Sequence, residues 1–162
     1  MNGTRPLRPL LVLVIGIAIG AGGTMLLTPS ETTTSPTYAT STATGCSTEP
    51  LPSGWLGQIG VDESRLVILN VTIGHDSPGI DLTHSLTEVS DGTFRFAITS
   101  TPTTAKGEPP AGCHPRTTLE ASISLPADFE ILEITIDGDP FATVENDDES
   151  FPSFRVVQPV ES

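Results

Sequence analysis

An uncharged hydrophobic run near the N-terminus constrains this chain more than any other feature. Residues 10–27 (LLVLVIGIAIGAGGTMLL) include no charged residue, and Arg5 and Arg8 precede them. As a helix, a run of this length spans about 27 Å, close to the roughly 30 Å of a bilayer's hydrocarbon core. Basic residues beside such a run stay in the cytoplasm. The pattern therefore predicts a single-pass membrane anchor, with residues 1–9 inside the cell and the rest of the chain outside.

A cleaved signal peptide is the alternative interpretation of this run, and the protein would then be secreted. Small residues at positions 21–23 resemble a cleavage site, but the apolar run continues to Leu27. We therefore favour a retained anchor. Gly16 and Gly20 also form a GxxxG pair, a spacing that lets two membrane helices pack closely and that also occurs without such packing.

Residues 28–48 change the character of the chain, because threonine and serine dominate them and Pro29 and Pro36 interrupt them. Such a stretch has too little to bury to offset its ordering entropy, so we expect a disordered stalk, with or without O-glycans. As a random coil of about twenty residues it would reach roughly 25 Å. Residues 49–162 then form one extracytoplasmic domain.

Charge is distributed unevenly along the chain. All twenty acidic residues, but only five of the seven basic ones, follow the hydrophobic run, so that part carries a net charge of −15. Such a surface repels phosphate backbones and anionic head groups. We expect no nucleic-acid partner, and instead a partner in the cell envelope or among membrane proteins; the sequence leaves the oligomeric state open.

Short strand patterns separated by turn signals fill the remainder. In residues 117–125, alternate apolar side chains would face a core while the residues between them face water. Asp91-Gly92 favours a tight hairpin turn. Further strands are predicted over residues 65–73, 82–89, 93–99, 129–136, 141–144 and 154–157. About seven or eight strands without a helical period predict an all-β, two-layer immunoglobulin-like β-sandwich, with a small barrel as the alternative.

Cys46 and Cys113 are the only cysteines. Two cysteines in a chain that faces an oxidising compartment most often pair. Their bridge would close a loop of roughly 67 residues and stabilise the fold by about 4 kcal/mol in the chain-entropy model. Two free thiols are the alternative. Lipid attachment at Cys46 is disfavoured, because this residue lies far beyond the hydrophobic run.

Residues 65–146 contain DGTFRF, a cysteine loop and TTLEASISLPADFEILEITIDGDPFATVEN. In composition and strand rhythm this segment resembles small secreted or membrane-anchored β-domain proteins of halophilic archaea, for which no activity is known. The resemblance implies a high-salt habitat and supplies no catalytic residue. The composition agrees with it, since one lysine among twenty carboxylates suits a surface that stays hydrated in concentrated salt.

Catalytic and metal-binding motifs are missing from the sequence, including GxSxG, a glycine-rich phosphate loop, HExxH and CxxC. The histidines are His75, His84 and His114, and Cys113-His114 with an upstream histidine suggests copper. No methionine follows Met25 to complete a blue-copper site. We therefore assign no catalytic, cofactor-binding or metal-ligating residue, expect no cofactor, and expect that the chain is not an enzyme.

A calcium-dependent module or a hydrolytic enzyme remains the alternative function. Residues 137–139 and 145–149 offer hard oxygen ligands, but neither stretch has the spacing of a helix-loop-helix calcium loop. On so acidic a surface, carboxylates also meet by chance rather than as acid and base. Asn70-Val71-Thr72 is a candidate N-glycosylation sequon that requires Asn70 to face solvent. We expect a membrane-tethered binding or structural module.

Overall fold

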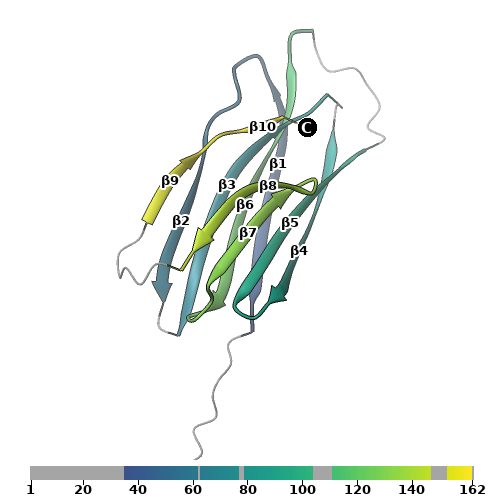
Figure 1. Ribbon diagram of the computed structural model, residues 1–162. Helices are drawn as coiled ribbons and strands as arrows, with labels where there is room; N and C mark the ends of the chain where they lie inside the picture. The colour runs from purple at the N-terminus through teal and green to yellow at the C-terminus, as the bar shows by residue number, and fades with distance from the viewer. Residues whose placement is uncertain (1–34, 62, 77–78, 104–110, 147–152, 162) are drawn as a thin grey trace, which may run out of the picture. The chain divides into compact units, whose positions relative to one another are not determined.

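The computed structural model describes residues 35–61, 63–76, 79–103, 111–146 and 153–161 (Figure 1). The predicted cytoplasmic residues 1–9 and the predicted anchor in residues 10–27 lie outside this part of the chain. Within it, there is no helix of the length and apolar character needed to cross a membrane.

The described residues form ten β-strands in two sheets. Sheet A has the order β1-β6-β3-β2-β9, and β10 pairs in parallel with the end of β3. Sheet B has the order β4-β5-β7-β8, in which β5 and β7 run parallel. In chain order the strands are β1 (Thr37–Ser47), β2 (Gly54–Val61), β3 (Ser64–Gly74), β4 (Ile80–Ser90), β5 (Thr93–Pro102), β6 (His114–Pro126), β7 (Ile131–Ile136), β8 (Asp139–Glu145), β9 (Ser153–Val157) and β10 (Val160–Glu161).

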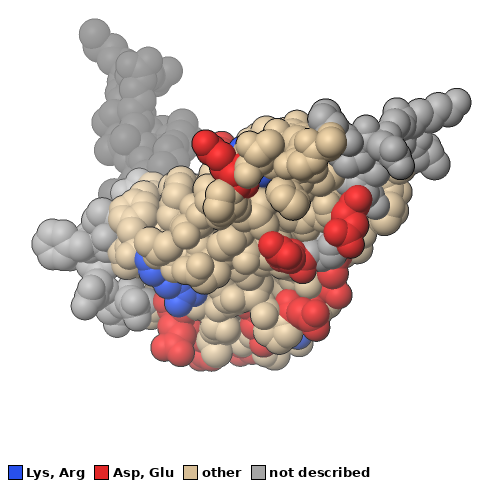
Figure 2. All heavy atoms as spheres, turned by 90° about the horizontal axis from the view of Figure 1, so that it is seen from above, with Lys and Arg blue, Asp and Glu red and all other residues tan. Residues whose placement is uncertain are grey.

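Both sheets contribute alternate side chains to one hydrophobic core. On β6 the alternation is regular, since Leu119, Ile123 and Leu125 are fully buried and Glu120 and Ser122 between them are exposed. The all-β prediction is confirmed, and two sheets that share one core are compatible with the predicted β-sandwich. Figure 2, which views the molecule from above, shows several acidic side chains and few basic ones on its surface.

The turn predicted at Asp91-Gly92 is confirmed, and the predicted start of one strand is wrong. Asp91-Gly92 joins β4 to β5, and Gly92 has a φ of +69°, a left-handed conformation that glycine adopts without strain. Strand β7 begins at Ile131, although the sequence pattern predicted a start at Phe129. The Phe129 side chain is buried, but its N–H donates to the Pro126 carbonyl (3.2 Å) in a turn before the strand.

The predicted stalk is wrong for residues 37–47, because they form β1. This strand pairs antiparallel with β6 along its whole length. A stretch of threonine, serine and alanine has few apolar groups to bury, but backbone pairing at a sheet edge does not require them. Every β1 side chain from Thr37 to Cys46 is indeed exposed. The folded domain therefore includes residues from Thr37 onward, and residues 28–34 lie outside the described part.

Both ends of β1 are held to the rest of the domain. Near its C-terminal end, Cys46 forms the predicted disulfide with Cys113, with the two Cα atoms 5.6 Å apart. Near its N-terminal end, the Tyr38 ring packs edge-on against Phe96 at 5.4 Å, and its hydroxyl donates to the carbonyl of His84 (2.9 Å). The disulfide and this aromatic contact explain how so polar a strand stays in place.

Candidate functional site

The outer face of sheet A carries a cluster of apolar side chains on β2, β3 and β9. Leu56, Val67 and Leu69 of these strands point into the core, so the residues between them point outward. We call the outward apolar set the Trp55 patch. It consists of Trp55, Ile59, Val61, Leu66, Ile68, Phe154 and Val156.

The centre of the Trp55 patch is a pair of solvent-exposed aromatic rings. Trp55 is 39% exposed, Phe154 61% and the neighbouring Val156 70%. The ring centroids of Trp55 and Phe154 are 6.2 Å apart with the planes tilted by 60°. Gly57 lies opposite Phe154, and a Cβ at this position would stand 2.5 Å from the Phe154 ring. The missing side chain therefore lets the ring lie across the β2 backbone beside Trp55.

A polar border adjoins the Trp55 patch on the side of β6. Asn70 lies opposite Trp55, and its Nδ2 donates to Glu120 Oε1 (3.2 Å). Beside Trp55 is a shallow cavity of about 300 Å³, walled also by Glu120 and Ser122 of β6 and by Ser41 of β1. Asn70 thus faces outward, as modification of its sequon requires, while the nitrogen that would carry a glycan is engaged with Glu120.

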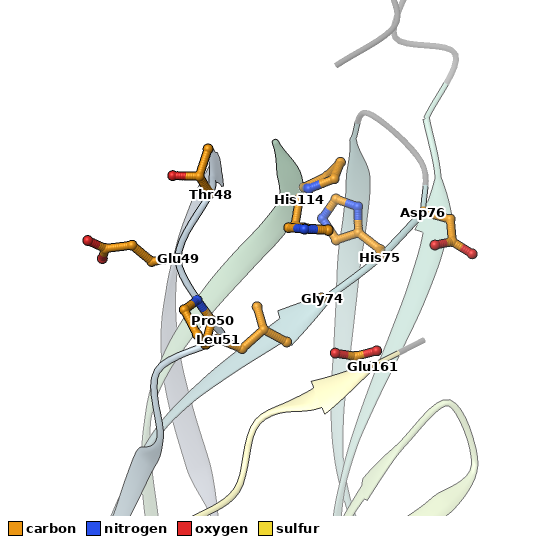
Figure 3. Close-up of a pocket in the computed structure, with 10 residues that line it drawn as sticks. Thr48, Glu49, Pro50, Leu51, Gly74, His75, Asp76, His114 and Glu161 are labelled. Carbon is orange, nitrogen blue, oxygen red and sulfur yellow. The ribbon is translucent and has the colours of Figure 1, made fainter. Parts of the chain in front are cut away.

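A second cavity, of about 320 Å³, lies where β3 ends and β6 begins, and Figure 3 shows His75 and His114 side by side in it. His75 is only 8% exposed, and its Nε2 lies 3.2 Å from Thr117 Oγ1. In Figure 3 the carboxylates of Glu49 and Asp76 point away from the two imidazoles. Among the described residues, no group of three or more His, Cys, Asp or Glu is placed to hold a metal ion.

The copper interpretation fails at Cys113, whose sulfur is bonded to Cys46. At the first calcium candidate, the carboxylate of Asp137 is engaged within the fold. The Asp137 carboxylate accepts hydrogen bonds from the N–H (2.6 Å) and the hydroxyl (2.7 Å) of Ser100, which fixes the turn between β7 and β8. In the second candidate, residues 147–149 lie outside the described part.

His84, the third histidine, lies on β4 and points toward the core. Its ring stacks on Phe96 with a centroid distance of 6.1 Å and an interplanar angle of 2°. Its Nε2 is buried and has no hydrogen-bond partner among the described residues, although the side chain as a whole is partly exposed. Burial lowers the pKa of His84 below its ordinary value of 6.5.

The Trp55 patch was not predicted from the sequence, although its residues were visible there. Trp55 and Phe154 are separated by almost a hundred positions, and only the pairing of β2 with β9 brings them together. The available signal was a pair of apolar residues, Phe154 and Val156, at alternate positions beside a basic one. Without a strand register, that pattern equally fits a buried strand.

Comparison of the chain with protein-family models, curated proteins and solved structures gives no match. The geometry of the Trp55 patch therefore carries the functional argument.

Proposed function

We propose that this protein is a membrane-tethered extracytoplasmic binding module of immunoglobulin-like sandwich type, which docks a protein of the cell envelope or membrane on the Trp55 patch. The observation that carries this proposal is the exposed pair of Trp55 and Phe154, in which the Phe154 ring lies over Gly57. Contiguous exposed apolar patches on soluble domains mark interaction surfaces, and aromatic residues dominate the binding energy of protein interfaces.

The charge pattern favours a protein partner over other ligands. None of the seven members of the Trp55 patch is ionisable, in a chain with a net charge of −13. An apolar protein surface covers such a patch without desolvating a carboxylate, and Asn70 and Glu120 supply a polar border along its β6 side. Phosphate backbones and anionic head groups would instead meet the repulsive surface around the patch.

Two features support the location outside the cytoplasm. The Cys46–Cys113 bridge is typical of oxidising compartments. The hydrophobic run of residues 10–27, preceded by Arg5 and Arg8, supports a tether with the domain outside.

The decisive experiment compares two variants of the tagged full chain in affinity capture from native membranes at high salt. Trp55→Ala combined with Phe154→Ala should weaken binding of the captured protein at least about thirtyfold, as expected for loss of a contact worth about 2 kcal/mol. Thr99→Ala, an exposed position on the outer face of sheet B, is the matched control and should leave binding unchanged.

Direct binding of the purified partner completes the test. Trp55 is the only tryptophan, so its fluorescence reports whether the patch is covered. A change in its emission that saturates with the partner supports the proposal. Equal binding by the wild type and the double variant, or a partner that leaves the emission unchanged, would contradict it.

A further inference from the structure

The free edge of β1 lacks the features that usually keep a sheet edge from pairing with another chain. Those features are charged residues, prolines, bulges and short length. Strand β1 (TYATSTATGCS) is eleven residues long and has no charged residue and no proline. Its register with β6 is continuous, and within the described part of the chain no strand pairs with its other side.

The three other outermost strands are each protected. Strand β4 carries Asp81 and Glu88 and has a register shift next to Glu88. Strand β8 carries two acidic residues and Pro140. Strand β9 is only five residues long and contains Arg155. The contrast sets β1 apart as a template for strand addition.

We propose that a second copy of this chain pairs with β1 in an antiparallel, two-fold arrangement that joins the two A sheets into one. With the axis at Thr42, this residue lies opposite Thr42 of the second copy, Thr40 lies opposite Thr44, and Tyr38 opposite Cys46. All eleven residues then find a partner, as a self-complementary interface requires.

Charge and space both favour a second copy as the occupant. The chain carries a net charge of −13, so two copies repel each other over most of their surfaces, whereas β1 is uncharged along its whole length. The side chains of Thr40, Thr42 and Thr44 lie on the inner side of sheet A and are nevertheless exposed. Sheet B therefore leaves the inner side of β1 uncovered at these three positions, although Tyr38 packs against it, and this leaves room beside β1 for the second copy.

The anchor and the symmetry of the dimer both bear on the proposed arrangement. The GxxxG pair at Gly16 and Gly20 would favour self-association of the proposed anchor independently of β1. The two-fold axis also keeps both outer faces on one side of the joined sheet. If the Trp55 patch is the docking face, which rests on the proposed function, the dimer presents two such patches to a partner and binds with avidity.

Cysteine cross-linking of the full chain in its membrane tests the register. Thr42→Cys should give an intermolecular disulfide, seen as a band at twice the chain mass on a non-reducing gel. The reason is that Cα atoms directly opposite in an antiparallel pair lie about 4.5–5.5 Å apart, within the range of a disulfide. Peptide mapping confirms in each variant that Cys46 and Cys113 remain bonded.

Thr40→Cys is the matched control on the same strand and the same face. In the proposed register it lies roughly 13 Å along the strand from its own counterpart, so it should not cross-link alone. Co-expression of Thr40→Cys with Thr44→Cys chains should restore the cross-link. Absence of the Thr42→Cys band, or equal cross-linking by Thr40→Cys alone, would overturn the proposal.

Mass measurement in mild detergent provides the second test. All chains in this test carry Gly16→Leu and Gly20→Leu, so that the anchor cannot hold two copies together. The parent chain should have twice the chain mass, Thr42→Lys should halve it, and Ser85→Lys on the β4 edge should leave it unchanged with the same added charge. A Thr42→Lys chain that stays dimeric would exclude β1 as the interface. Trp55→Ala with Phe154→Ala should retain the Thr42→Cys cross-link, so failure of the docking proposal and failure of the dimer are separately visible.

Discussion

The two sheets of this domain share one core but present different outer faces to solvent. The outward positions of sheet B are mainly polar, and Arg95 of β5 forms an ion pair with Glu133 of β7 (2.7 Å). The outward positions of β2, β3 and β9 in sheet A form the Trp55 patch instead. A folded two-layer domain needs only its inner faces to be apolar. The outer face of sheet A is thus more apolar than folding requires, and this excess of apolar side chains is why we propose the binding function there.

The largest effect is expected where sheet A depends on a covalent link. Replacing Cys46 and Cys113 by serine should reduce the free energy of unfolding by about 4 kcal/mol in the chain-entropy model. Because β1 buries little, loss of the disulfide should speed the amide exchange of β1 more than that of β5 in sheet B. Chemical denaturation of the full chain measures the change in the free energy of unfolding. Hydrogen exchange of the native protein measures the exchange of each strand. Unchanged stability, or exchange that rises equally in both strands, would contradict the idea that the disulfide holds β1.

A smaller effect is expected from a substitution within the Trp55 patch, the part of the outer face of sheet A that has no counterpart on sheet B. Gly57→Ala should push the Phe154 ring out of place, because the added Cβ would stand 2.5 Å from it. We expect about fivefold weaker partner binding, or about 1 kcal/mol. Thr99→Ala, an exposed position on the outer face of sheet B, is the control. If both variants bind alike, the seating of Phe154 over Gly57 has no role in binding.

Inner faces were predictable from the sequence, and outer faces and edges were not. The alternation of Leu119, Ile123 and Leu125 marked the core side of β6, because burial leaves a period of two in the residues. The Asp91-Gly92 turn was predictable because its backbone conformation selects glycine. Strand β1 was missed because it is held by backbone pairing, by Tyr38 and by the disulfide, and these leave no hydrophobic period in the sequence.

The stack of His84 on Phe96 within sheet B provides a pH test of intermediate size. Because burial lowers the pKa of His84 below 6.5, the unfolded chain takes up the proton at a higher pH than the folded one. The stability due to the neutral ring is then complete above pH 6.5 and is lost as the pH falls toward the lowered pKa.

His84→Phe preserves the stack on Phe96 but cannot be protonated, so its melting temperature should fall less between pH 6.5 and roughly pH 5. The exposed His114, replaced in the same way, serves as the control and should follow the wild type. An identical pH dependence of all three proteins would show that the stack of His84 on Phe96 does not sense protonation.

The smallest effect is expected at the ion pair of sheet B. Both Nε and Nη2 of Arg95 donate to Glu133 Oε2, but the two side chains are 46% and 39% exposed. Solvent screens such a pair, so it contributes at most about 0.5 kcal/mol. Glu133→Gln removes the pair and also one charge from a repulsive surface, whereas Glu145→Gln on β8 removes only the charge. The difference between the two variants isolates the pair.

Thermal melts of these proteins across a salt series measure that difference. It should vanish by roughly 1 M salt, where the Debye length is about 3 Å. The melting temperature of the wild type should rise over the same range, because its excess carboxylates repel one another until salt screens them. A wild-type melting temperature that does not change with salt would remove both the role assigned to repulsion and the high-salt habitat that the resemblance implies.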